Sequence, residues 1–168
     1  MKRLSALFLA SATLSSCGLH PLYEGGTRGP VAQTLSGIEV GPIGGQSGWL
    51  MRNALVDRLG AMGNGTPRYK LIVELDDQIA GLGINSQNTV TRERRTLRAR
   101  YRLVDNGGTG ETLLDATAGS DTGIDVVSSD YATLAAEQTA LENLTQDVAD
   151  QILSRLALYA RRTASPAK

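Results

Sequence analysis

The sequence predicts an α+β domain in which two helices pack on one face of a mostly antiparallel four-stranded sheet, in the order β-α-β-β-β-α. Three observations predict this class. Apolar residues recur at helical spacing over residues 47–59, and then at every second position from residue 69 onward. The dipeptide Asn106-Gly107 is a hairpin signal between two alternating stretches. A long amphipathic segment ends the domain, so helices bracket a meander of strands.

The first two elements are a short strand and a helix. Residues 38–43 alternate in polarity and end in a stretch rich in glycine and proline, which indicates a strand closed by a turn. Residues 47–59 carry apolar side chains at every third or fourth position, and Gly60 follows as a residue that commonly ends helices. Residues 63–67, GNGTP, predict the next turn.

Three strands follow. Residues 69–76 alternate strictly between apolar and polar positions, as expected for a strand with one buried face. Residues 81–88 are expected to bend the chain back into a longer strand over residues 89–104. After the hairpin, the returning strand continues the core face. The residues predicted to face the core on the last two strands are Leu97, Ala99, Tyr101, Leu103, Leu114, Ala116 and Ala118.

A long helix is predicted from the capping residues 128–130 to about Arg161. Its apolar stripe is predicted to consist of Tyr131, Leu134, Leu141, Leu144, Val148, Ile152, Leu156 and Tyr159. Residues 35–161 therefore form one domain of ordinary size, and residues 162–168 are expected to be a disordered tail.

The N-terminal region has the layout of a bacterial lipoprotein precursor. Residues 1–16 begin with two basic residues and continue with an apolar run too short to span a membrane, as in a secretory signal peptide. The run ends in Leu-Ser-Ser-Cys, which resembles a lipobox with Cys17 as the lipidated, mature N-terminus. The alternative is a free or structural cysteine, although a single thiol cannot form an internal disulfide. Residues 17–34 are then a lipidated tether, and Gly18 after the cysteine favours the outer membrane.

Charge and hydropathy exclude two classes of protein. The chain has 17 basic and 17 acidic residues, and loss of Lys2 and Arg3 with the signal leaves 15 basic residues. This mildly acidic balance excludes a globally basic nucleic-acid binder. After the signal, no apolar run approaches the roughly 20 residues of a membrane helix. We therefore expect the protein to be held on a membrane by its lipid without crossing it.

The sequence offers little for catalysis or for a cofactor. His20 is the single histidine and lies three residues beyond the predicted anchor. Zinc sites usually need several Cys or His ligands, which the mature chain lacks. Asp76 and Asp77 are adjacent on a strand and so point to opposite faces. The glycine-rich residues 41–48 lack the Gly-Lys-Ser/Thr ending of a phosphate-binding loop. We expect a protein that is not an enzyme and has no cofactor.

One charged pattern stands out in residues 91–102, TRERRTLRARYR. Five arginines share one parity and should project from one face of the strand, about 6.6 to 6.8 Å apart for successive pairs. They are Arg92, Arg94, Arg98, Arg100 and Arg102.

Two interpretations of this arginine row stay open. It is either a solvated face paired with acids on the neighbouring strands, or a binding strip for an anionic ligand, because guanidinium groups suit phosphate and carboxylate. The acids with matching parity are Glu74, Asp76, Asp115 and Asp121.

The segment LSSCGLHPLY, residues 14–23, resembles the start of alphaproteobacterial members of the LPS-assembly lipoprotein family, LptE. In that family a lipobox cysteine is followed by glycine, an apolar residue, a variable position and Pro-Leu-Tyr. The predicted element order is also similar to the family's fold of two helices against a four-stranded sheet.

The resemblance implies an outer-membrane lipoprotein on the periplasmic side. Such a protein plugs a β-barrel (LptD-like) that inserts lipopolysaccharide, has no catalytic residues, and binds lipopolysaccharide through basic side chains. The natural place for such binding here is the row of five arginines. The alternative from the same compartment is an auxiliary lipoprotein of a lipid-transport ABC system.

Overall fold

The computed structural model describes residues 26–63, 65–84, 90–108 and 110–164. Its elements run in the order α-β-α-β-β-β-α after a short 3-10 turn, η2. They are η2 (Gly26–Arg28), α2 (Pro30–Ser36), β1 (Ile38–Val40), α3 (Gly45–Gly60), β2 (Tyr69–Ile84), β3 (Val90–Asp105), β4 (Thr112–Asp125) and α4 (Asp130–Ala164). The predicted α+β class and its order are confirmed, with α2 as an additional helix.

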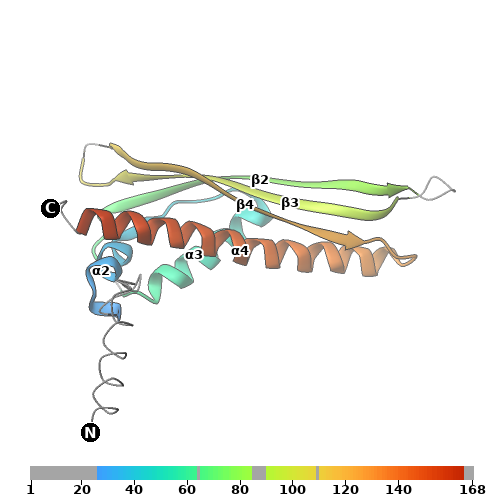
Figure 1. Cartoon of the computed structure of the whole chain (residues 1–168), viewed down its shortest axis with the longest axis horizontal. Helices are drawn as coiled ribbons and strands as arrows, with labels where there is room; N and C mark the ends of the chain where they lie inside the picture. Colours follow the sequence, from blue (N-terminus) through green and yellow to red (C-terminus); the bar gives the residue numbers. More distant parts are fainter. Residues whose placement is uncertain (1–25, 64, 85–89, 109, 165–168) are drawn as a thin grey trace, which may run out of the picture.

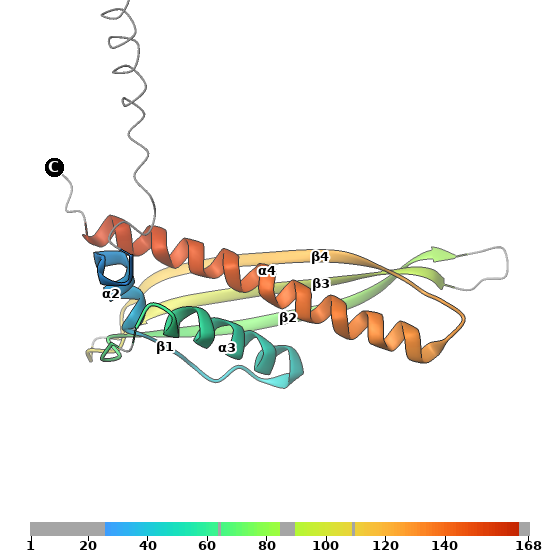
Figure 2. The ribbon, with the colours of Figure 1, turned by 90° about the horizontal axis from the view of Figure 1, so that it is seen from below.

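The four strands form one mixed sheet in the order β1-β2-β3-β4. The short β1 pairs with β2 in parallel, whereas the long β2–β3 and β3–β4 pairs are antiparallel. Helices α3 and α4 lie on the same side of this sheet (Figures 1 and 2). Within the described residues, no helix covers the opposite side, which we call the open face.

The core lies between the sheet and the two helices, as the alternation of the strands predicts. Leu97, Ala99, Tyr101 and Leu103 of β3 are at most 1% exposed. They meet a stripe of buried residues along α4 that begins at Ala140 and ends at Ala160. Each fully buried large apolar side chain contributes about 1.5–3 kcal/mol. Hydrophobic burial therefore fixes which side of β3 faces the helices, and so which side carries the arginines.

Helix α2 was not predicted, and it begins inside the range 17–34 that the sequence suggested as a tether. Pro30 occupies the first helical turn, where a missing N–H costs nothing. Val31, Ala32 and Leu35 are buried, and α2 packs against α4. The apolar pattern of a seven-residue helix is too short to be recognised in the sequence. Such a short helix is stabilised mainly by packing, here against α4. The predicted signal, Cys17 and the first part of the tether lie outside the described residues.

The predicted bend at residues 81–88 is wrong in part, because β2 continues to Ile84 and pairs there with Val90 of β3. The register shifts between Gly81 and Ile84, where glycines interrupt the alternation. Ile79 is 43% exposed. This end of β2 buries no clear apolar face, so its sequence lacks the alternation that would predict a strand. Its backbone pairing with β3 defines it as part of the strand.

Two predictions for α4 also change. The helix extends to Ala164, three residues beyond the predicted end, and residues 165–168 of the predicted tail lie outside the described residues. Tyr131 and Leu134, predicted to face the core, are 83% and 62% exposed. The apolar residues in the first turns of α4 thus continue the helical pattern but are not buried in the core.

An ion pair joins the two long helices. Arg58 of α3 donates from Nε to Asp150 Oδ1 of α4 at 2.6 Å, and its other nitrogens donate to the carbonyls of Ala54 and Gln146. The hydrogen bond from Arg58 lowers the pKa of the Asp150 carboxyl group. Asp150 stays 65% exposed, so the pair belongs to the weak class of surface ion pairs.

We expect Asp150→Asn to lower the free energy of unfolding by about 0.5–1 kcal/mol at pH 7. A lowered folded-state pKa stabilises the protein above the unfolded-state value of about 3.9, and this contribution is lost as the pH falls through the folded-state pKa. Urea unfolding of parent and variant should therefore differ at pH 7 and converge in acid. Asp147→Asn, on the same helix but paired with Ser120 rather than an arginine, is the matched control. A difference that persists unchanged in acid would contradict the assignment.

Candidate functional site

The open face carries the predicted arginine row. The five arginines share one parity along β3, opposite to that of the buried Leu97, Ala99, Tyr101 and Leu103. Each lies opposite residues of β2 and β4 in the strand register. The predicted shared face is thus confirmed by the strand register. The members of the row are Arg92, Arg94, Arg98, Arg100 and Arg102.

Four of the five arginines form ion pairs on this face. Three of the acids were predicted from parity, namely Glu74, Asp115 and Asp121, while Asp125 was not. The pairs are Arg92–Asp125 at 3.5 Å, Arg94–Asp121 at 3.5 Å, Arg100–Asp115 at 2.9 Å and Arg102–Glu74 at 3.2 Å. Every member of these pairs has a side chain at least 38% exposed, so water competes with each contact. Such pairs contribute little stability and are cheap to open.

The pair between Arg100 and Asp115 has the best geometry of the row. Arg100 donates from both Nε and Nη2 to the two carboxylate oxygens, at 3.3 and 2.9 Å. These hydrogen bonds raise the pKa of Arg100 and lower the pKa of Asp115. The guanidinium of Arg100 is therefore already matched by a carboxylate in the free protein.

Arg98, in the middle of the row, differs from its neighbours. Within the described part of the chain it forms no ion pair with an acid. Asp76 lies opposite it on β2 but accepts hydrogen bonds from Gln78 at 3.0 and 3.2 Å. Sequence parity suggested Asp76 as a counter-charge, and the structure gives that acid a neutral partner instead.

Glycine on β4 makes room for the Arg98 side chain. Gly119 is its partner in the strand register, and a Cβ atom at Gly119 would lie 3.3 Å from Arg98 Cγ. The aliphatic part of Arg98 can therefore lie close against β4. Arg98 and Gly119 line a shallow groove of about 670 Å³ that also includes Gln151. β4 is an edge strand of the sheet. The Gln151 side chain of α4 accepts a hydrogen bond from the backbone N–H of Gly119 at 3.3 Å and donates one to its C=O at 3.2 Å, and so pairs with part of this edge.

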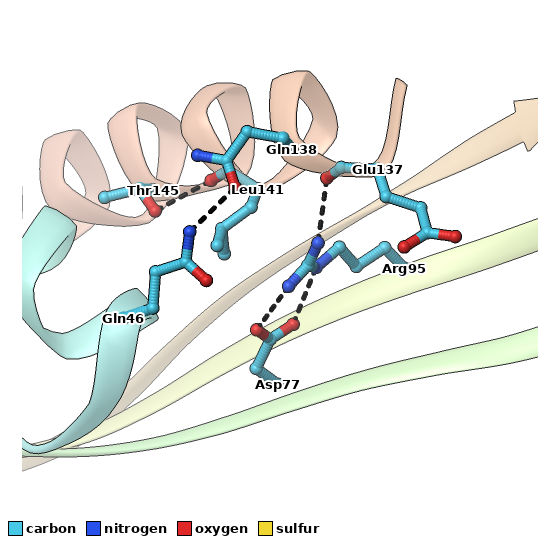
Figure 3. Close-up of polar contacts among 7 residues, drawn as sticks. All are labelled: Gln46, Asp77, Arg95, Glu137, Gln138, Leu141 and Thr145. Carbon is cyan, nitrogen blue, oxygen red and sulfur yellow. Dashed lines mark hydrogen bonds and ion pairs between the residues drawn. The ribbon is translucent and has the colours of Figure 1, made fainter. Parts of the chain in front are cut away.

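Arg95 belongs to the same run of sequence but points to the helix side (Figure 3). It donates from Nε and Nη2 to both oxygens of Asp77, at 2.9 and 2.7 Å, and from Nη1 to the Glu137 carbonyl of α4 at 2.8 Å. The Arg95 and Asp77 side chains are 12% and 20% exposed. The hydrogen bonds to Asp77 raise the pKa of Arg95, against an opposing effect of burial. The odd position of Arg95 in the alternation was the signal for this different role.

The described part of the chain has neither a cluster of metal-binding side chains nor a membrane-spanning helix. In residues 26–63, 65–84, 90–108 and 110–164, no three His, Cys, Asp or Glu side chains come together as a group that could hold a metal ion. None of the helices in this part of the chain has the length and apolar character needed to cross a bilayer. His20 and Cys17 lie outside it.

Comparisons with known proteins agree with this fold. Residues 35–156 match the LptE family, described as lipopolysaccharide-assembly. The chain is 26% identical to a Caulobacter crescentus protein of known crystal structure, with a TM-score of 0.67 over 83% of this chain and 100% of the other. No curated protein matches the chain in sequence.

Two more distant structures share the fold. A minor lipoprotein of Acinetobacter baumannii has 16% identity and a TM-score of 0.59 over 72% of this chain and 90% of its own. The rare lipoprotein B of Shewanella oneidensis has 13% identity and a TM-score of 0.53 over 76% and 98%. Since the family match extends over most of the chain, including the sheet, α3 and much of α4, the protein belongs to the LptE family of lipopolysaccharide-assembly lipoproteins.

Proposed function

We propose that this protein is an outer-membrane lipoprotein that assists lipopolysaccharide transport as the partner and plug of the LPS-assembly β-barrel. Residues 1–16 are its signal peptide, Cys17 carries the lipid, and the domain of residues 35–161 works on the periplasmic side. The family match supports the role in lipopolysaccharide assembly. An auxiliary lipoprotein of a lipid-transport ABC system, the alternative, has no comparable support.

The observation that carries the ligand proposal is Arg98 in the groove of the open face. Its guanidinium has no acid partner among the described residues, and it can present several N–H donors to a phosphate group. The ligand class is therefore an anionic lipid headgroup, as in lipopolysaccharide. The protein acts by binding, with no catalytic residue and no cofactor.

The neighbouring ion pairs support this binding mode. Arg100 and Arg102 are already held on this face by their ion pairs with Asp115 and Glu74. Ordering these long side chains in advance lowers the entropy cost of binding. Because exposed pairs are cheap to open, an incoming phosphate can take over part of their hydrogen bonds. Arg98 provides the first contact, and the flanking arginines extend it.

We expect Arg98→Gln to weaken lipopolysaccharide binding by about tenfold, since a hydrogen bond to a charged group contributes about 1.5–3 kcal/mol. The triple change Arg98→Gln, Arg100→Gln and Arg102→Gln should weaken it further and leave the remaining binding less sensitive to salt. Binding is measured with purified lipopolysaccharide at two salt concentrations, and folding by circular dichroism. Arg52→Gln, an exposed arginine of α3 on the helix side, is the matched control.

Unchanged binding in a folded triple variant would return the row to a solvated, ion-paired surface. Equal losses for Arg98→Gln and Arg52→Gln would show that net charge matters and position does not. A larger loss for Arg98→Gln than for either Arg100→Gln or Arg102→Gln is the specific expectation. Among the described residues, Arg100 and Arg102 each have a carboxylate partner to give up, whereas Arg98 has none.

A further inference from the structure

Asparagine followed by glycine occurs twice in the chain, at Asn64-Gly65 and at Asn106-Gly107. This dipeptide is chemically labile, because the backbone nitrogen of the glycine can attack the side-chain amide carbon of the asparagine and no Cβ atom stands in the way. The attack needs a backbone nitrogen that is free to approach. The two glycines differ in this respect, so the structure separates two sites that look alike in the sequence.

The backbone nitrogen of Gly65 is held in place. Its N–H donates to the carbonyl of Ser36, the last residue of α2, at 3.2 Å. A Cβ atom at Gly65 would lie 2.8 Å from Ser36 Oγ and 2.9 Å from its carbonyl oxygen, so the backbone here packs tightly on α2. Attack by this nitrogen requires that the bond to Ser36 break first and that the backbone move away from the helix. Asn64 itself lies outside the described residues.

The backbone nitrogen of Gly107 has no such contact. Gly107 lies in the exposed turn after β3, at the α2 end of the molecule (Figure 1). Within the described part of the chain, its N–H donates no hydrogen bond to another backbone group. The preceding residue is anchored, since the Asn106 N–H donates to the Arg68 carbonyl at 2.9 Å. The exposed Asn106 side chain is therefore attached to a fixed backbone beside a glycine nitrogen that is open to solvent.

We propose that Asn106 is a site of spontaneous deamidation in the folded protein, whereas Asn64 is protected. The Gly107 nitrogen loses its proton and forms a bond to Asn106 Cγ, and the side-chain nitrogen leaves with that proton as ammonia. Water then opens the cyclic imide at one of its two carbonyls. The products are aspartate or isoaspartate at position 106, so the net reaction consumes one water and releases one ammonia. This modification is independent of the proposed function.

Both products change the turn between β3 and β4. Each adds one negative charge to a turn that already carries Asp105 and Glu111. Isoaspartate also adds a methylene group to the main chain directly after the residue whose N–H bonds to Arg68. Deamidation therefore alters the charge, and as isoaspartate the backbone length, of the turn that contacts the residue before β2.

The test ages the purified full-length protein, folded, in mildly alkaline buffer and follows both asparagines by peptide mass spectrometry. Deamidation adds about 1 Da to a peptide. We expect the Asn106 peptide to convert about fivefold faster than the Asn64 peptide, because attack at Asn64 requires one hydrogen bond of ordinary strength to break. In urea, where the bond from Gly65 to Ser36 is lost, the two rates should converge.

Gly107→Ala identifies the attacking nitrogen. Gly108 has the left-handed φ of 113° in this turn and Gly107 does not, so alanine at position 107 fits the backbone. Its Cβ atom would lie 3.3 Å from the Asp105 carboxylate, which is the mobile end of a side chain. Conversion at Asn106 should fall severalfold because the new methyl group hinders the attack, with the circular dichroism spectrum unchanged. Asn106→Asp supplies the standard for the charge change in anion-exchange chromatography.

Three results would overturn the proposal. The first is conversion at Asn64 that equals or exceeds conversion at Asn106 in the folded protein. The second is a rate ratio that persists in urea, because the flanking sequence and not the structure would then set it. The third is undiminished conversion in folded Gly107→Ala, which would show that the Gly107 nitrogen is not the nucleophile.

Discussion

Changing Cys17 to alanine is expected to remove the protein from the outer-membrane fraction completely and to abolish its lipid mass. The lipobox interpretation makes this thiol the acceptor of the acyl chains. Each buried CH₂ contributes about 0.8 kcal/mol, so several chains on one cysteine form an anchor that does not dissociate. Mass spectrometry of membrane-extracted protein, together with separation of inner and outer membranes, measures both effects.

Two further variants make the Cys17 experiment decisive. Ser16→Ala keeps a small residue before the cysteine and should be processed normally. Replacing residues 1–17 with a signal peptide cleaved at an A-x-A site should release the folded domain from the membrane fraction, because the chain then lacks the lipid-bearing cysteine. An unmodified Cys17 in the parent, or a mature chain that begins elsewhere, would refute the lipoprotein assignment.

Changing Arg95 to methionine is expected to lower the free energy of unfolding by about 2–4 kcal/mol. The change leaves the Asp77 carboxylate largely buried without its cation and takes the donor from the Glu137 carbonyl. Both losses fall where β2, β3 and α4 meet, near the first turn of α3 (Figure 3). Urea unfolding measures the total effect, and hydrogen exchange should show the early turns of α4 opening first.

The adjacent residue is a matched control for Arg95. Arg94 is also an ion-paired arginine, but it lies on the open face with its side chain 54% exposed, so Arg94→Met should cost no more than about 1 kcal/mol. Combining Arg95→Met with Asp77→Leu should recover part of the loss, because a buried pair replaced by apolar side chains leaves no charge unpaired. Similar losses for Arg94→Met and Arg95→Met would show that Arg95 does not link the sheet to α4.

Strong periodicity made much of the fold predictable. The alternation of β3 placed Leu97 and Tyr101 in the core and Arg98 on the opposite face, as the structure confirms. A charged side chain cannot be buried cheaply, whereas an apolar one stabilises the fold when buried, so the pattern has one low-energy orientation. The same reasoning held for α4 from Leu141 onward.

Periodicity failed where burial depends on what lies beside an element. Tyr131 and Leu134 fit the stripe of α4, yet they are exposed because α3 does not extend far enough to cover them. Val31 and Leu35 gave no usable signal, yet they are buried because α2 packs on α4. In both cases the decisive partner is distant in sequence.

The sequence by itself determined the order of the elements from β1 to α4, although not helix α2, and the face on which the five arginines lie. It also predicted a lipid anchor at Cys17, because local alternation and short motifs encode such features. Only the tertiary structure decided which arginines are paired. The alternation of the strands allows an ion pair between Arg98 and Asp76, which lie opposite each other in the register. In the structure, the Asp76 carboxylate instead accepts a hydrogen bond from Gln78. It also decided that Arg95 and Asp77 join the sheet to α4. Ion pairs depend on distances of a few ångströms between separate strands, and the spacing of residues along one strand does not set those distances.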